Sequence, residues 1–251
     1  MNIRIIPVLD LKDGVAVHAV RGQRDAYAPV RSVLAASADP VALARAFMER
    51  LGSQECYVAD LDAIAGRGDH GPTIRAIAQL GLAVWLDAGV STVSDAERAV
   101  GQGAARVIIG TETLGDPRDL PGIAAATRGA ATRPAPCSAL SLDLREGRLL
   151  GGSPAVERLD PLDVADLAWE AGIRTFIVLD LARVGHGHGV DTSVALRLRQ
   201  AFPGAEIIVG GGTRDVEDLR RLARQGFDGA LVATALHTGA ITSGAVEAGT
   251  P

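Results

Sequence analysis

The chain of 251 residues is rich in small apolar residues and poor in aromatic ones, with 47% hydrophobic residues, 3% aromatic residues and 30 glycines. Its formal charge of −5 excludes the broad basic surface that nucleic-acid binding requires, so local donors would have to hold any anionic ligand. Apolar runs stay well short of the roughly 18 residues of a membrane span, and the start leads directly into a strand-like segment, unlike a signal peptide. We therefore expect a soluble cytoplasmic protein of the α/β class.

Short apolar runs alternate with helical patterns along the whole chain. Runs of the buried-strand type predict strands at 3–9, 56–60, 82–86, 105–109, 137–142, 174–179, 205–209 and 228–232. The segments between them predict helices at about 40–51, 71–80, 93–102, 116–127, 160–171, 191–201 and 214–225. Helix starts are indicated by Asp39-Pro40 and Asp160-Pro161, and Ser94 with Glu97 matches a capping box. The alternation predicts a parallel sheet with right-handed crossovers.

The second half of the chain repeats the first. Residues 38–66 reappear as 159–187, and within these segments Asp60 matches Asp180 at an offset of 120. Residues 83–114 reappear as 206–237 at an offset of 123, which matches Gly89 with Gly212.

Each half therefore supplies four strand-helix units in the same order, and two such halves close into a barrel that buries every strand edge. We predict a single (β/α)8 TIM barrel over residues 1–251, built from half-barrels at about 1–127 and 137–251.

Two carboxylates repeat with the halves. Residues 8–14 read VLDLKDG and residues 141–147 read SLDLREG, which places Asp10 and Asp143 at the ends of the first and fifth strands. Reacting groups in such barrels lie at the carboxyl ends of strands. Two carboxylates on opposite sides of the mouth, one to abstract and one to deliver a proton, suit isomerisation next to a carbonyl or an imine.

Three further aspartates, Asp60, Asp87 and Asp180, also follow apolar runs at predicted strand ends. An Asp that leaves a strand often only caps the next helix or bonds loop N–H groups, and this reading stays open for each of them.

Glycine-containing turns follow four of the strands, as DAGVS (87–91), IGTE (109–112), GGGTR (210–214) and VATA (232–235). Such turns let backbone N–H groups approach a phosphate at a helix N-terminus, although tight packing alone also selects glycine. The loops after strands seven and eight commonly bind phosphate in this fold, and their counterparts in the first half suggest a second phosphate opposite. The predicted binding residues are Gly89, Gly110, Thr111, Gly211, Gly212, Ala233 and Thr234.

Two loops could complete the site. The loop at 14–34 carries Arg21, Arg24 and Arg31 and is long enough to close over a ligand, unless it is only a solvated basic loop. His186 lies among glycines and could contact substrate or transfer a proton. With His188 two positions later and no third ligand, the pair gives poor support for zinc, and we expect no metal site.

The segments IIPVLDLKDG, VIIGTETL, SLDL and GGGTRDVEDL resemble the phosphosugar-binding barrels of histidine biosynthesis. These are the ProFAR isomerase (phosphoribosylformimino-aminoimidazole-carboxamide ribotide isomerase) and the cyclase subunit of imidazole glycerol phosphate synthase. The resemblance covers nearly the whole chain. It implies a barrel of the ribulose-phosphate-binding type, a ligand with phosphates at both ends, and Asp10 as general base with Asp143 as the second carboxylate. The isomerase turns an aminoaldose into an aminoketose without a cofactor.

Three loops depart from the pattern of that family. After the sixth strand the family carries Thr-Asp-x-x-(Lys/Arg)-Asp-Gly-Thr, whose second Asp is the general acid. This chain has Val184 there, so Asp143, Asp180 or His186 would have to supply the proton. The Gly-Gly-Gly-Ile-Arg of the third strand has become DAGVS, and the Gly-Arg of the eighth has become Ala-Thr. Of the two predicted phosphate sites, the one that includes the loop after the seventh strand therefore matches the family pattern more closely.

The segments RGQRDAYAPVRSVL and YVADLDAI look more like a functionally uncharacterised branch of isomerase relatives, from methane-producing archaea and one-carbon-using bacteria. Three functions stay open: isomerase-type acid–base chemistry on a phosphorylated small molecule, a different isomerase or lyase reaction in one-carbon cofactor biosynthesis, and a non-catalytic barrel that binds a phosphorylated metabolite. We expect a phosphorylated small-molecule substrate, no cofactor, no nucleic-acid or membrane partner, and a monomer or small homo-oligomer.

Overall fold

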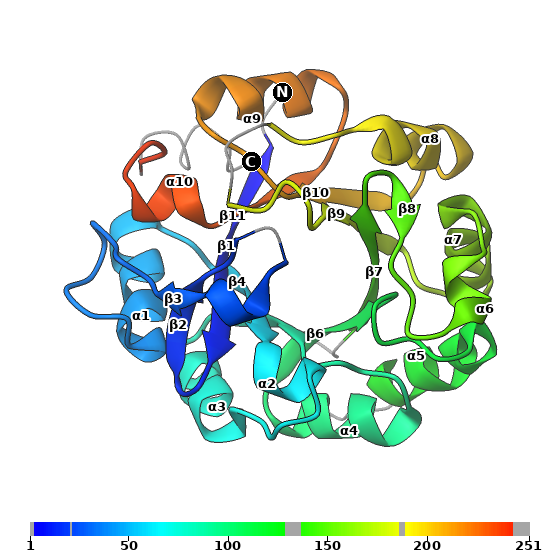
Figure 1. Cartoon of the computed structure of the whole chain (residues 1–251), viewed down its shortest axis with the longest axis horizontal. Helices are drawn as coiled ribbons and strands as arrows, with labels where there is room; N and C mark the ends of the chain where they lie inside the picture. The colour runs from blue at the N-terminus through cyan, green and yellow to red at the C-terminus, as the bar shows by residue number, and fades with distance from the viewer. Residues whose placement is uncertain (1–2, 21, 129–136, 186–188, 243–251) are drawn as a thin grey trace.

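The computed structural model describes residues 3–20, 22–128, 137–185 and 189–242, which form a barrel of parallel strands ringed by helices (Figure 1). Within these residues the barrel strands are β1 (Arg4–Lys12), β4 (Glu55–Asp60), β5 (Ala83–Asp87), β6 (Ala104–Gly110), β7 (Cys137–Arg145), β9 (Thr175–Asp180), β10 (Glu206–Gly210) and β11 (Gly229–Val232). Each strand pairs in parallel with the next, and β11 pairs with β1. This closure confirms the predicted (β/α)8 barrel.

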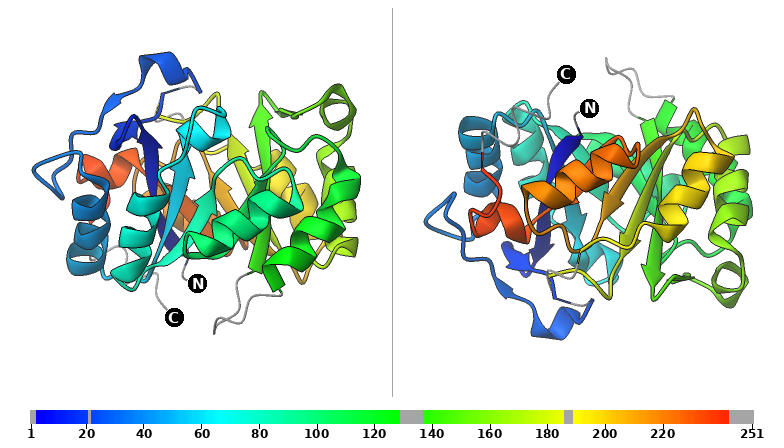
Figure 2. Two further views of the ribbon diagram at one scale, coloured as in Figure 1. Left: turned by 90° about the horizontal axis from the view of Figure 1, so that it is seen from below. Right: turned by 90° about the horizontal axis from the view of Figure 1, so that it is seen from above.

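Helices follow the barrel strands and pack outside them (Figures 1 and 2). They are α1 (Pro40–Leu51), α3 (Gly71–Gln79), α4 (Val93–Gly101), α5 (Leu120–Arg128), α7 (Pro161–Glu170), α8 (Ser193–Ala201), α9 (Val216–Arg224) and the short α10 (Thr234–His237). Asp39 and Asp160 cap α1 and α7 as predicted, by accepting hydrogen bonds from backbone N–H groups. Among the described residues, no helix has the length and hydrophobicity needed for a membrane crossing.

The predicted capping box of α4 is wrong by two residues. Thr92 is the N-cap, because its backbone is extended and its side chain accepts from the Asp95 N–H, while Asp95 bonds back to Thr92. Ser94 already lies inside the first helical turn, where a side chain cannot serve as the N-cap.

Several short elements that sequence patterns did not predict lie in the connections that follow the strands. They are β2 (Val15–His18), η1 (Arg24–Ala26), β3 (Ala28–Pro29), α2 (Leu61–Ile64), β8 (Arg148–Leu149) and α6 (Pro154–Glu157). The predicted helix at 116–127 begins with the short 3-10 helix η2 (Pro117–Asp119). Figure 2 shows the dark-blue segment of β2, η1 and β3 at the end of the barrel toward which β7 and β8 also extend. Elements of two to four residues are too short to show a hydrophobic period.

The repeated Asp-Leu-(Lys/Arg)-(Asp/Glu)-Gly segments form two similar hairpins. β1 turns into β2 through Asp13 and Gly14, and β7 turns into β8 through Glu146 and Gly147. All four turn residues have positive φ, between 50° and 82°, as a two-residue type I′ hairpin turn requires. The repeat therefore encodes a barrel strand that continues beyond the barrel as a hairpin arm.

Side chains inside the barrel lie in three layers, because alternate residues of every strand point inward. The middle layer is apolar and consists mainly of Ile6, Tyr57, Trp85, Ile108, Ala139, Ile177, Ile208 and Leu231. The residues two positions earlier on these strands, at their amino-terminal ends, form a charged layer. Two positions after the middle layer, at the carboxyl ends, lie Asp87 of β5, Ser141 of β7 and the glycines Gly110 and Gly210.

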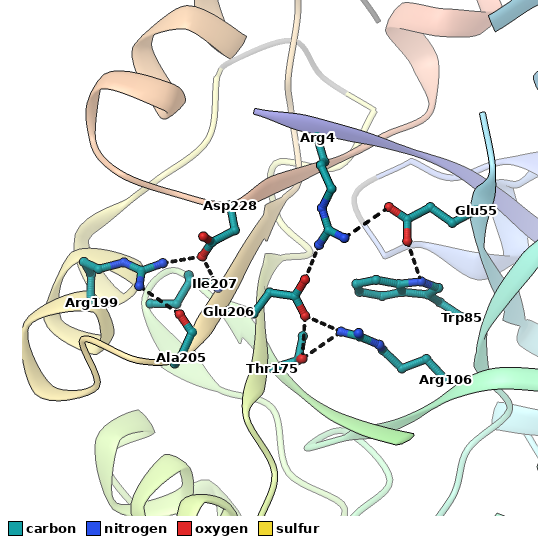
Figure 3. A network of polar contacts seen from close by, with 10 residues as sticks. All are labelled: Arg4, Glu55, Trp85, Arg106, Thr175, Arg199, Ala205, Glu206, Ile207 and Asp228. Carbon is teal, nitrogen blue, oxygen red and sulfur yellow. Dashed lines mark hydrogen bonds and ion pairs between the residues drawn. The ribbon is translucent and has the colours of Figure 1, made fainter. Parts of the chain in front are cut away.

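The charged layer closes the amino-terminal end of the barrel with one connected network (Figure 3). Glu206 accepts hydrogen bonds from Arg4, from Arg106 and, at 2.6 Å, from the Thr175 hydroxyl. The Arg106 guanidinium lies 4.0 Å from the centre of the Trp85 ring, and the Trp85 indole donates to Glu55 at 3.0 Å. Burial raises the pKa of Glu206, but the charge of Arg106 and the hydrogen bonds outweigh it and hold this pKa below its ordinary value.

Replacing the shared anion should destabilise the barrel. In the variant Glu206→Gln, Arg4 and Arg106 lose their common counter-charge in a partly buried layer. We expect the free energy of unfolding, measured by urea denaturation, to fall by about 1–3 kcal/mol. Glu217→Gln is the control, since Glu217 is exposed on α9 and its ion pairs with Arg220 and Arg224 lie in solvent. Equal losses in both variants would contradict this role of Glu206.

Candidate active site

A cavity of about 290 Å³ lies at the carboxyl-terminal end of the barrel. Four carboxylates line it: Asp10 of β1, Asp87 of β5, Asp143 of β7, and Glu112 in the turn after β6. The turns after β10 and β11 also line it. The structure thus brings together both aspartates of the repeated segments and the predicted phosphate loops of the second half, at the end of the barrel where (β/α)8 enzymes place their reacting groups.

Asp10 lies in β1 opposite Val17 of the β2 arm and beside Ala59 of β4. Burial raises the pKa of Asp10 to about 7, and the negative charge of Asp87 acts in the same direction. The positive charge of Arg24 opposes this rise. A carboxyl group with a pKa near neutrality can exchange protons readily at that pH, which suits a general base.

Asp143 is 4% exposed and is held at both carboxylate oxygens. The Ser141 hydroxyl donates to Oδ1 at 2.8 Å and the Glu112 N–H donates to Oδ2 at 3.2 Å. Burial nevertheless raises the pKa of Asp143 to about 8, together with the charge of Asp87. Asp143 therefore carries its proton at neutral pH, when it can act as an acid.

Asp87 lies next to this pair and is bound to an interior tyrosine. The Tyr57 hydroxyl donates to Asp87 Oδ2 at 2.9 Å, and the Gly89 N–H donates to Oδ1 at 3.3 Å. Burial raises the pKa of Asp87 to about 6 and holds that of Tyr57 well above its ordinary range. Because the charge of Asp87 raises the pKa values of both Asp10 and Asp143, the three groups titrate as a coupled cluster.

Gly110 of β6 makes the close approach of two carboxylates sterically possible. A Cβ atom at this position would lie 2.9 Å from Asp143 Oδ2 and 3.9 Å from Asp87 Oδ2. Any side chain here would displace Asp143, so glycine at 110 shapes the acidic cluster although it does not itself line the cavity.

Alternate residues of a barrel strand point inward, and this strand parity distinguishes the cavity aspartates from Asp60 and Asp180. Asp10, Asp87 and Asp143 stand an even number of positions after the inward residues of their own strands, whereas Asp60 and Asp180 directly follow inward positions. Asp60 is fully buried, caps α2 through the Ala63 N–H and accepts from the backbone and ring of His70.

Asp180 is likewise engaged outside the cavity wall. It accepts from the Ala182 N–H at 3.0 Å and pairs with the Arg183 Nε at 3.2 Å. Val184, which replaces the acid of the family pattern, does line the cavity. His186 lies outside the described residues, so among the described acid candidates Asp143 is the one that reaches the cavity.

The loop after β1 contributes one of its three predicted arginines. Arg24 of η1 lines the cavity and donates to Glu112 at 2.6 Å, while Lys12 donates to the Arg24 carbonyl at 2.9 Å. Arg31 is exposed and is not among the described residues that line the cavity, and Arg21 lies outside the described residues. The loop thus reaches the cavity through Arg24, which ties it to the loop after β6, and its role as a lid stays a prediction.

The turn after β10 has the features of an anion site. Gly211 and Gly212 have φ values of 91° and 102°, and a Cβ on Gly211 would lie 2.6 Å from the Asp180 carbonyl oxygen, so only glycine fits. Thr213 is 8% exposed, and its buried hydroxyl has no hydrogen-bond partner among the described residues. Ala233 and Thr234 after β11 lie on the same side of the cavity wall.

Tyr57, Glu112 and Thr213 are among the cavity residues that sequence reasoning missed. The inward parity of Tyr57 could have indicated it, because a tyrosine inside a barrel needs a partner for its hydroxyl. Glu112 and Thr213 stand in turns that were noted for their glycines alone. In the described part of the chain, no cluster of three or more His, Cys, Asp or Glu side chains is placed to hold a metal ion.

A closed (β/α)8 barrel with buried carboxylates and a glycine turn at the carboxyl ends of its strands has the layout of a barrel enzyme that acts on a small anionic molecule. Residues 4–242 match the family model described as histidine biosynthesis protein, and the chain belongs to this family.

Its relatives include named isomerases. The chain is 34% identical over 242 residues to a 1-(5-phosphoribosyl)-5-((5-phosphoribosylamino)methylideneamino) imidazole-4-carboxamide isomerase of Thermus thermophilus, with 95% of this chain and 96% of that protein covered. The isomerase of the same name from Symbiobacterium thermophilum is 33% identical over 251 residues, with 96% and 94% covered. An uncharacterized protein of Methanocaldococcus jannaschii is 34% identical over 246 residues, with 95% of both covered. The chain is thus an isomerase-like member of its family.

The raised pKa values of the cluster predict that stability falls as pH rises. Asp143 binds its proton more tightly in the folded than in the unfolded chain, so its favourable contribution is complete below its ordinary pKa and is lost as pH rises toward 8. In Asp143→Asn this loss is removed. We expect the fall in unfolding free energy between about pH 5 and pH 8, measured by urea denaturation, to be smaller than in the wild type by about 1–3 kcal/mol.

Glu49→Gln, an exposed change on α1, is the matched control and should follow the wild-type pH dependence. The same pH dependence in Asp143→Asn and the wild type would show that Asp143 is ionised in the folded protein at low pH, against this prediction.

Proposed function

We propose that this protein is an isomerase that uses acid–base chemistry on a phosphorylated small molecule, by an aminoaldose-to-aminoketose rearrangement or a related proton transfer. The observation that supports this most strongly is the placement of Asp10 and Asp143 in one cavity with pKa values of about 7 and 8. One group that accepts and one that donates a proton near neutral pH is what an isomerisation next to a carbonyl or imine needs.

In the proposed reaction Asp143 acts first, as the acid. As the bond between the anomeric carbon and the ring oxygen breaks, the ring oxygen takes the Asp143 proton and the amine lone pair forms a C=N⁺ bond. Asp10 then removes the proton from the adjacent carbon, and the electron pair of that C–H bond forms C=C while the C=N⁺ pair returns to nitrogen. Tautomerisation of this enol to the ketone completes the aminoketose, and Asp10 and Asp143 exchange protons with solvent before the next turnover.

The phosphate group would bind at the turn after β10. Gly211 and Gly212 allow the backbone to approach an anion, the N-terminus of α9 adds positive potential, and the unpartnered Thr213 hydroxyl can donate a hydrogen bond. Thr234 lies beside them on the cavity wall. These contacts would orient the reacting carbons toward the carboxylates of β1 and β7.

A different isomerase or lyase reaction on a related phosphate ester is the second candidate. It is favoured by Val184, because an apolar side chain stands on the cavity wall at the position of the family's general acid. It would use the same two carboxylates. The proposal further includes a cytoplasmic protein that works without a cofactor, as a monomer or a small homo-oligomer.

Replacement of the proposed base should abolish turnover without loss of binding. Aminoaldose phosphates, including the substrate of the named isomerases, would be incubated with the full chain in D2O, and product formation followed by NMR. We expect Asp10→Asn to lower the rate by about 10²–10⁴-fold, the usual contribution of a general base. Ribulose 5-phosphate should still bind to the variant within about three-fold of wild type, since the proposed phosphate contacts are made by the turns after β10 and β11 and not by the Asp10 carboxylate.

Asp166→Asn, an exposed change on α7, should leave both rate and binding unaltered. Full activity of Asp10→Asn would contradict the role of Asp10 as the base. Binding of the sugar phosphates without turnover of any of them by the wild type would favour a non-catalytic barrel instead.

A further inference from the structure

The two halves of the barrel differ in the turns that follow their third and fourth strands, although the sequence repeat matches these turns with one another. The offset of 123 residues matches Gly89 with Gly212, and the same offset matches Thr111 with Thr234. In the second half Gly212 and Thr234 line the cavity, whereas Gly89 and Thr111 are not among the described residues that line it. The expected second phosphate site therefore has no exposed backbone cradle.

The turn after β5 already uses its own hydrogen-bond donors. The Gly89 N–H donates to Asp87 Oδ1, and the N–H groups of Ser91 and Thr92 both donate to Asp95 at 3.2 Å and 2.9 Å. A Cβ atom on Gly89 would lie 2.9 Å from the Ile64 Cα atom, because α2 packs directly on this turn. A phosphate would have to displace the Asp87 carboxylate and the helix. The bonds to Asp95 do not distinguish the halves, because the matching Arg214 N–H donates to Asp218 in the same way.

The turn after β6 is closed in the same way. The Thr111 N–H donates to the Ser141 carbonyl at 2.9 Å, and the Thr111 hydroxyl accepts from the Asp143 N–H at 2.9 Å. A Cβ on Gly152 would lie 2.6 Å from the Thr113 carbonyl carbon, so the segment after β8 covers this turn. Both turns of the first half thus serve the packing of the mouth.

The charge on this side of the cavity also opposes an anion. Asp87 takes the place of Gly210 in the repeat, and it lines the cavity together with Asp10, Asp143 and Glu112. Two charges of like sign repel more strongly near a protein surface than in water, because the effective dielectric constant there is lower. Arg24 is the cation whose charge acts on both Asp10 and Asp87, and it is already bound to Glu112.

We infer that the cavity accepts a singly phosphorylated substrate, with its phosphate at the turns after β10 and β11 and a neutral or cationic hydrogen-bond donor, a hydroxyl or an amine, at its opposite end. Asp87 is the residue that determines this preference, through its charge and through its bond to the Gly89 N–H. The inference rests on the proposed function for the position of the first phosphate. It separates this protein from the relatives whose name carries two phosphoribosyl groups.

Three ligands on one carbon frame test the inference, because they differ only at C1. Ribulose 5-phosphate carries a hydroxyl there, 1-amino-1-deoxyribulose 5-phosphate an amine, and ribulose 1,5-bisphosphate a second phosphate. Titration calorimetry on the full wild-type chain should give affinities for the first two at least about ten-fold higher than for the bisphosphate.

Removal of the Asp87 carboxylate should raise the affinity for the bisphosphate relative to the other two ligands. Asp87→Gly restores the residue of the matching position and frees the Gly89 N–H, so we expect the bisphosphate affinity to rise by about ten-fold or more while ribulose 5-phosphate stays within about three-fold. Asp87→Asn removes the charge and keeps the size, and it should raise the bisphosphate affinity in the same direction if the glycine variant does not fold. Asp166→Asn should match the wild type with all three ligands.

Equal or tighter binding of the bisphosphate by the wild type would overturn the inference and leave the proposed function intact. Bisphosphate affinity that does not change in a folded Asp87 variant would overturn the role of Asp87. Failure of all three ligands to bind would contradict the proposed phosphorylated substrate and this inference with it.

Discussion

The pairing of β11 with β1 is the constraint on which the rest of the molecule depends. Once the sheet is closed, every strand sends alternate side chains into one shared interior, and the position of a residue along its strand sets its depth. An apolar middle layer separates the charged network of the amino-terminal end from the carboxylates of the mouth. The network stabilises the barrel at one end, and this lets the other end hold groups whose ionisation opposes folding.

The two halves show how a duplicated frame can diverge without loss of the fold. The hairpin arms and the inward aspartates of β1 and β7 remain alike in both halves. The turns after the third and fourth strands of each half do not, since Gly212 and Thr234 of the second half line the cavity whereas the matching Gly89 and Thr111 are not among the described residues that line it. Backbone geometry has thus been kept while the partners of its N–H groups have changed.

Much of this architecture could be predicted from sequence, because buried parallel strands, helix starts and a long repeat all leave patterns in the chain. Asp10 and Asp143 could be located because the same segment recurs at two strand ends. Asp60 and Asp180 looked equivalent to them, and strand parity, which could have been counted, is what distinguishes them. The partnership of Tyr57 with Asp87 could not be seen, because the two residues are 30 positions apart and meet only across neighbouring strands. The occupied donors of the turn after β5 likewise depend on packing by α2, a helix too short to leave a hydrophobic period.

The hairpin arms reduce the amount of backbone that must become ordered when a ligand binds at the site. Strand ends in a barrel mouth usually give way to loops, whose residues must be ordered again each time a ligand arrives. Here β1 and β7 run on into tight two-residue turns, and the Leu150 N–H bonds back to the Asp143 carbonyl at 2.7 Å. The backbone that carries each carboxylate is therefore ordered when the chain folds, and this entropy is not lost again at each encounter with substrate.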